Sequence, residues 1–101
     1  MIKHIVWWTL KEEAEGATAA ENAEKMIRML RELDGRIPSL MAIEASSAIA
    51  ATTTEQVDVI LQTVHASAED LQAYAEHPEH VKCVGFIKAV VSGRKAIDYE
   101  V

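Results

Sequence analysis

The sequence predicts an α+β fold in which one four-stranded antiparallel sheet carries helices on a single face. Residues 2–10 alternate at period two with large apolar groups on both faces, which is typical of a strand that is buried on both sides. Two helix-start signals, Thr18 with Glu21 and Ser67 with Asp70, each precede a segment of helical periodicity. The resulting order of strand, helix, strand, strand, helix pair and strand is that of the split βαβ arrangement.

The first half of the chain supplies two strands and one helix. Thr18 and Glu21 have the spacing of a capping box, in which each side chain binds a free N–H group of the first turn. Gly35 suits the left-handed residue that ends a helix, and Pro38 prevents the helix from continuing. The predicted elements of this half are a strand at 2–10, an acidic connector at 11–17, a helix at 19–34, a strand at 40–49 and a turn at 50–55.

The second half supplies two more strands and a pair of helices. Val57, Val59 and Leu61 alternate with Asp58, Ile60 and Gln62 at the period of a strand. Pro78 suits the first turn of a helix, so it separates the second helix from the third. The predicted elements of this half are a strand at 56–64, a short helix from Ser67 to about Ala75, a helix from Pro78 to about Val91, a break at Ser92–Gly93 and a strand at 95–101.

Composition narrows the classes of function. The 101 residues carry 10 Lys and Arg against 16 Asp and Glu, and a net charge of −6 argues against nucleic acid and anionic membrane as partners. No apolar run approaches the ~20 residues of a membrane span, and no secretory signal pattern is found. The single cysteine, Cys83, excludes an internal disulfide and fits a reducing compartment. We therefore expect one cytoplasmic domain over residues 1–101, with no metal and no cofactor.

One face of the predicted sheet has no helix to cover it. Ile5 and Trp7 point to this face from the first strand, and Ile60 and Val64 point to it from the third. Monomeric proteins rarely leave an apolar patch of more than a few hundred Å² in water. A second copy related by a two-fold axis is the simplest cover, so the sequence predicts a homodimer.

Four segments spread over nearly the whole chain form a recognisable set. They are Lys3-His4-Ile5-Val6, Ile37-Pro38, Tyr74 with His77-Pro78-Glu79-His80, and Asp98-Tyr99. The most specific is the His-Pro-x-His motif with a tyrosine three residues before it. In content and order, these segments resemble the stress-responsive dimeric α/β-barrel (Dabb) family. The resemblance implies a ferredoxin-like half-barrel and a homodimer, in agreement with the pattern of the residues.

The resemblance also implies candidate site residues. The best-defined chemistry of the family is that of a plant polyketide cyclase, which closes a linear polyketide by aldol condensation. Tyr74 and His80 match its catalytic pair and His4 matches a pocket histidine, but Val59 stands where the cyclase has a further histidine. The predicted binding pocket, between the helices and the sheet, is lined by His4, Val6, Trp8, Val59 and Val84.

Three functions remain open. His80 lies one turn from the start of its helix, where the partial positive charge favours the neutral imidazole that a general base requires. The first function is a cyclase-like or isomerase-like enzyme, with Tyr74 as oxyanion donor to a small apolar carbonyl compound. The second is a stress-associated dimer of undefined activity whose histidines are mainly structural. The third is an oxidative enzyme of the related monooxygenase type. His65, near a strand end, is expected to be solvated.

Overall fold

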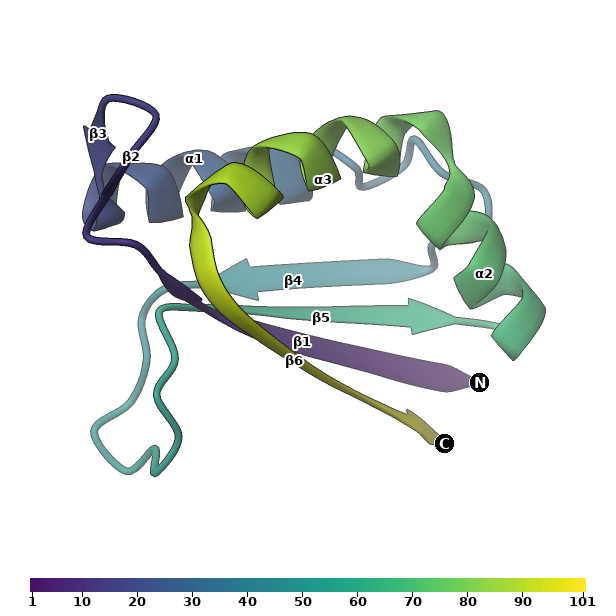
Figure 1. Cartoon of the computed structure of the whole chain (residues 1–101). Coiled ribbons are helices and arrows are strands. Elements are labelled where there is room, and N and C mark those ends of the chain that lie inside the picture. Colours follow the sequence, from purple (N-terminus) through teal and green to yellow (C-terminus); the bar gives the residue numbers. More distant parts are fainter.

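In the computed structural model, which describes residues 1–101, four antiparallel strands form one sheet in the order β4-β5-β1-β6 (Figure 1). Helices α1 and α3 lie side by side over one face of this sheet, and α2 lies at one end of the layer. This is the ferredoxin-like split βαβ fold that the order of the elements predicts. The elements of the sheet and of the helical layer are β1 (Ile2–Leu10), α1 (Ala19–Arg31), β4 (Ala42–Ser46), β5 (Val59–His65), α2 (Ala68–Glu76), α3 (Pro78–Val90) and β6 (Val91–Glu100).

Strand β1 is a central strand, hydrogen-bonded to β5 on one side and to β6 on the other. Side chains alternate between the two faces of a strand, so Val6, Trp8 and Leu10 all point towards the helices, where they are buried. The apolar stripe of α1 packs against them. The core side chains that the helical layer contributes include Met26, Ile27, Leu30, Tyr74, Cys83, Ile87 and Val90.

The caps of the helices follow the local signals of the sequence. Thr18 Oγ1 accepts a hydrogen bond from Glu21 N at 3.2 Å, and Glu21 Oε1 accepts one from Thr18 N at 3.0 Å. Ser67 caps α2 in the same position. Helix α1 ends at Arg31 rather than at Asp34, because its last residues form a series of turns that closes at Gly35, whose φ is +78°.

The predicted acidic connector at 11–17 contains a small hairpin. Its strands are β2 (Glu13–Ala14) and β3 (Ala17–Thr18). Glu15 and Gly16 have φ values of 52° and 73°, and such positive values at both central positions are required by the tightest hairpin turns. The buried Asn22 side chain donates to Ala14 O at 3.0 Å, so α1 fixes the hairpin in place.

Strands β4 and β5 are shifted from their predicted bounds by hydrogen bonds of neighbouring side chains. Predicted at 40–49, β4 ends at Ser46, whose Oγ accepts from Ala48 N at 3.0 Å and turns the chain away from the sheet. Predicted from residue 56, β5 begins only at Val59. Before it, the Asp58 carboxylate accepts from Leu10 N at 2.7 Å and so takes the place of a backbone partner.

Helix α3 leads directly into β6 without the predicted break at Ser92–Gly93. The strand begins at Val91 and runs beside β1. At the irregularity in this pairing, a Cβ atom on Gly93 would lie 3.0 Å from Thr9 Oγ1, so the close approach favours glycine. Strands β1 and β6 remain paired to the chain ends, where Val101 N donates to Met1 O at 2.9 Å.

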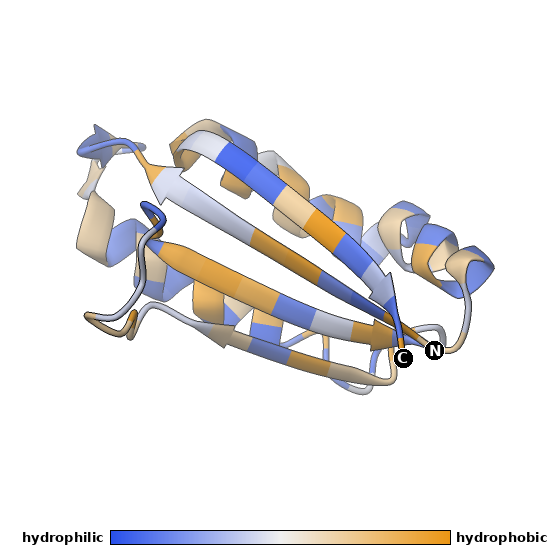
Figure 2. Cartoon of the chain, turned by 90° about the horizontal axis from the view of Figure 1, so that it is seen from below, coloured by the Kyte–Doolittle hydropathy of each residue, from blue (hydrophilic) through white to orange (hydrophobic).

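The sheet face opposite the helices is uncovered within one chain, and Figure 2 views the molecule from this side. Pairing registers place the predicted residues Ile5, Trp7, Ile60 and Val64 on it, all half-buried. Strand β6 adds Ile97 and Tyr99, which are 53% and 42% exposed. The loop between β4 and β5 extends below this face in Figure 1. None of the helices combines the length and the apolar character that crossing a membrane would require.

The capping box of α1 gives a direct test of how this helix begins. Replacement Thr18→Ala should lower the free energy of unfolding by about 1 kcal/mol, because N–H groups of the first turn lose their acceptor. Urea denaturation measures this loss. The control is Thr52→Ala in the exposed β4–β5 loop, where a change of less than about 0.5 kcal/mol is expected. Equal losses in the two variants would contradict the role of the cap.

Candidate functional site

A cavity of about 380 Å³ lies between the helices and the sheet. Its walls come from β1, α1, β5, α3 and the beginning of β6. Most of the lining side chains are hydrophobic, and four carry nitrogen-bearing polar groups. The hydrophobic lining residues are Val6, Trp8, Leu30, Leu61, Val84, Ile87 and Val91. The polar lining residues are His4, His80, Lys88 and Arg94.

His80 reaches this cavity from the first turn of α3. Its Nδ1 lies 2.9 Å from the carbonyl oxygen of Ala75, and a carbonyl can only accept, so Nδ1 carries the hydrogen. In the neutral imidazole this leaves Nε2 unprotonated and without a protein partner. Burial lowers the pKa of His80, although the bond to Ala75 partly opposes the shift. Desolvation is therefore the main reason that His80 is neutral, rather than the helix dipole alone.

Tyr74 is brought against His80 but does not line the cavity. The two ring centroids are 4.5 Å apart, so the chain does fold back across Pro78 in the way that an interaction between these residues requires. Tyr74 is only 1% exposed, and its hydroxyl has no hydrogen-bond partner. Burial raises the pKa of its phenol, which therefore stays neutral. Tyr74 is placed to support the His80 ring rather than to touch a molecule in the cavity.

His4 lines the cavity from β1 and is hydrogen-bonded to Asp98. The analysis of the sequence did not assign Asp98 to the site. Strand pairing sets His4 opposite Asp98 of β6, and His4 Nδ1 hydrogen-bonds to the Asp98 carboxylate. The carboxylate accepts the hydrogen of Nδ1, so it orients the ring and leaves Nε2 as the second nitrogen without a partner. Asp98 could be found only from the register of two strands that are more than 90 residues apart in sequence.

Of the five residues predicted to form the pocket, the structure places four in the cavity wall. These are His4, Val6, Trp8 and Val84. The fifth, Val59, is fully buried opposite Trp8 and is not a lining residue. Leu61, two residues further along the same face of β5 and opposite Val6, lies in the wall instead.

His65 is buried, and the prediction that it is solvated is wrong. Its Nδ1 lies 2.8 Å from Ser39 O and its Nε2 lies 2.9 Å from Thr63 Oγ1, so both nitrogens have partners. Burial is the main cause that lowers the pKa of His65. Its ring centroid lies 4.9 Å from that of Tyr74. His65, Tyr74 and His80 therefore form a continuous row of rings, in which His65 is a structural member with no free nitrogen.

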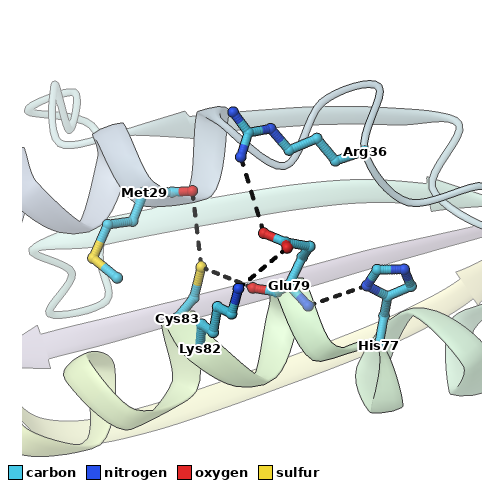
Figure 3. Close-up of polar contacts among 6 residues, drawn as sticks. All are labelled: Met29, Arg36, His77, Glu79, Lys82 and Cys83. Carbon is cyan, nitrogen blue, oxygen red and sulfur yellow. Dashed lines mark hydrogen bonds and ion pairs between the residues drawn. The ribbon is translucent and has the colours of Figure 1, made fainter.

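Two other reactive side chains of α3 have structural roles (Figure 3). The Cys83 thiol lies 3.6 Å from Glu79 O and 3.8 Å from Met29 O, and burial raises its pKa, which disfavours the nucleophilic thiolate. His77 Nδ1 accepts from Glu79 N at 3.1 Å and so caps α3. The structure contains no group of three or more His, Cys, Asp or Glu side chains that could hold a metal ion.

Residues 2–101 match the family model described as the stress responsive A/B barrel domain (Dabb). Among curated proteins, nothing matches the chain significantly. The fold is similar to that of a dimeric ferredoxin-like protein of unknown function from Bacteroides fragilis, with a TM-score of 0.85 at 23% identity over 99% of this chain and 95% of that one. A similar protein from Thermobifida fusca, also described as dimeric, gives 0.82 at 20% identity over 99% and 90%. A hydroxynitrile lyase from Passiflora edulis gives 0.81 at 11% identity over 99% and 92%.

Two histidines, the buried His65 and the half-buried His80, should make stability depend on pH. Their lowered pKa values mean that the unfolded chain binds protons that the folded chain does not. Stability is therefore complete above the ordinary histidine pKa of about 6.5 and decreases as the pH falls below it, by up to about 1.4 kcal/mol for each unit of pKa shift. Urea denaturation between about pH 7.5 and 5.5 measures this slope, the window following from the same ordinary value.

His65→Gln should reduce this slope, because one of the two groups no longer titrates. The control is Asn22→Ala, which removes a buried side chain that does not titrate. It should lower stability at every pH and leave the slope unchanged. Identical slopes in His65→Gln and in the unmodified protein would show that His65 does not contribute.

Proposed function

Because the chain belongs to the stress responsive A/B barrel domain (Dabb) family, we propose that it is a homodimeric enzyme in which His80 abstracts a proton from a small, largely apolar carbonyl compound. The observation that supports this proposal most is the cavity of about 380 Å³ against which the His80 ring lies. A histidine with a purely structural role would be surrounded by packed side chains or bonded through both nitrogens, as His65 is.

The cavity suits a small ligand. Its volume is near the lower end of the range of about 300–1,000 Å³ that is typical of small-molecule sites. Seven of its eleven lining residues are hydrophobic, so the free energy of binding comes mostly from burial of an apolar body. The few polar groups then orient the ligand. Among proteins of similar fold, the hydroxynitrile lyase supports the view that this architecture can carry an enzyme.

The proposed step is enolisation. The Nε2 atom of His80 takes a proton from the carbon beside the carbonyl group, the electron pair of the broken C–H bond forms a C=C bond, and the π pair of the C=O bond moves onto the oxygen. The bond from Nδ1 to Ala75 keeps the correct nitrogen unprotonated. His4, oriented by Asp98, lines the same cavity from β1, and its free Nε2 can accept a hydrogen bond from a donor group of the ligand. In a conjugated enolate, return of the proton to the far carbon gives an isomer, and attack of the enolate carbon on a second carbonyl group of the same molecule gives a ring.

We assign Tyr74 to positioning His80 rather than to direct donation to the substrate. Its ring packs against the imidazole, and its hydroxyl is shielded from the cavity. This departs from the role that the resemblance to the polyketide cyclase implies. The second candidate function, a non-catalytic dimer with structural histidines, is favoured by one observation, since the only hydrogen bond of His80 goes to a backbone carbonyl.

Exchange of α-protons for deuterium in simple ketones tests the base without knowledge of the natural substrate. The unmodified protein should accelerate this exchange in 2-hexanone, and His80→Asn should lose about 10²–10⁴-fold of the acceleration. Asn keeps a donor for Ala75, so the melting temperature should change little. NMR spectroscopy in D₂O follows the exchange.

The matched control is His77→Asn, at the N-cap of the same helix and outside the cavity. Asparagine is a good N-cap, so this variant should retain both fold and exchange. If the unmodified protein neither binds 2-hexanone nor accelerates its exchange, the non-catalytic function is favoured. If His80→Asn exchanges as fast as the unmodified protein, His80 is not the base.

The homodimer in this proposal forms through the uncovered sheet face. Ile97 and Tyr99 lie there with the half-buried Ile5, Trp7 and Ile60, so apolar side chains from three strands share this face. A two-fold axis would place the same surface of a second copy against it. The similar structures from Bacteroides fragilis and Thermobifida fusca are described as dimeric, which supports this assembly.

Replacement Ile97→Glu should convert the dimer into a monomer, because it places a charge in the apolar contact. Light scattering coupled to size exclusion at micromolar concentration measures the mass. Val81→Glu is the control, since Val81 is β-branched and 53% exposed like Ile97 but lies on the helical layer. It should remain dimeric. A monomeric unmodified protein, or a dimeric Ile97→Glu variant, would contradict this interface.

A further inference from the structure

We propose that the ligand of the cavity is a monocarboxylate, with an apolar body inside the cavity and its acid group bound between Lys88 and Arg94 at the rim. This proposal rests on the proposed function, because it names the class of substrate that the same site accepts. It adds that the carbonyl group beside His80 belongs to a molecule that also carries a negative charge several carbon atoms away.

The charges of the cavity wall differ in sign from those of the whole protein. The chain has a net charge of −6, yet none of the eleven lining residues is acidic and two, Lys88 and Arg94, are cationic. The Asp98 carboxylate lies beside the lining residue His4, and it is already hydrogen-bonded to that ring. The cavity is therefore a local positive region in an acidic protein, and it attracts an anion.

Lys88 and Arg94 have no partner within the chain. Neither forms a hydrogen bond or an ion pair, and both are exposed at the edge of the cavity. Lys95, the next residue along β6, points to the opposite face of the sheet and does pair, with Glu55. Cationic side chains that converge on an apolar cavity without a partner are available to a ligand.

Geometry gives the ligand its approximate length. His80, Val84 and Lys88 follow one another at intervals of four residues, so they lie on the same side of α3. The backbone positions of His80 and Lys88 are separated by eight residues, or about 12 Å along the helix axis. The Lys88 side chain leans back towards the beginning of the helix, which shortens this distance. A chain of several carbon atoms would thus join a carbonyl group at His80 to a carboxylate at the rim.

The location of Lys88 near the end of α3 favours a carboxylate over a phosphate as the bound anion. Phosphate sites commonly use backbone N–H groups at the beginning of a helix, but Lys88 lies in the last turn of α3. The partial negative charge at this end of a helix disfavours a dianion more than a monoanion. A single carboxylate on an arginine, with lysine beside it, meets both conditions.

Paired probes that differ only in charge test the inference. Isothermal titration calorimetry at low salt would compare 7-oxooctanoate with its neutral amide, 7-oxooctanamide. The acid should bind about tenfold more tightly, as two partly exposed ion pairs would provide. The double variant Lys88→Gln/Arg94→Gln should abolish this preference and leave the affinity for the amide unchanged. Lys95→Gln, which removes a neighbouring cation on the opposite face, should retain it.

The outcomes separate this inference from the proposed function. Equal affinities for acid and amide, or an unchanged preference in the double variant, would overturn the carboxylate site. In that case, α-proton exchange that depends on His80 would still support His80 as the general base. A tenfold preference for the acid without any exchange would uphold the carboxylate site and overturn the base. Failure of both probes to bind would overturn both. Displacement of 7-oxooctanoate by inorganic phosphate at equal concentration would also overturn the choice of carboxylate.

Discussion

Strand β1 has apolar side chains on both of its faces, and both faces must be shielded from water. The remaining structure is arranged around this constraint. Strand β1 pairs with β5 and β6 along both edges, so all of its side chains belong to one of two faces. Val6 and Trp8 form the floor of the core and part of the cavity wall, whereas Ile5 and Trp7 form the centre of the uncovered face. Alternation at period two in one strand thereby places the cavity and the face that we assign to the dimer on opposite sides of β1.

The break between α2 and α3 determines which side chains can act together. His77 ends one helix and caps the next, and this sharp turn returns Tyr74 to the ring of His80. The backbone of α2 also supplies the acceptor for His80, through Ala75. The tautomer of His80 is thus set by the backbone at the end of α2 and not by a carboxylate side chain. In contrast, His4 depends on the pairing of β1 with β6.

Local signals predicted the fold well, and features that depend on distant segments were predicted poorly. The order of the elements and the caps at Thr18 and Ser67 could be recognised because their residues are close in sequence. The bond of His65 to Ser39 and that of Asp98 to His4 could not be recognised, because they depend on strand register and on contacts across the chain. The same reason explains why Leu61 lines the cavity where Val59 was predicted. Glu15-Gly16 also lacks the Asn-Gly pattern that marks most tight hairpins.

The joined ends of β1 and β6 have a consequence for how the chain can be connected. Met1 and Val101 are held together by backbone hydrogen bonds, while the β4–β5 loop extends away from the helices. A short covalent bridge between the two termini, with new ends opened in that loop, would keep the sheet order of this half-barrel. Such a circular permutant would leave the cavity walls uncut. It would place the new chain ends beside the sheet face that we assign to the dimer, so folding of one subunit and association of two could be manipulated separately.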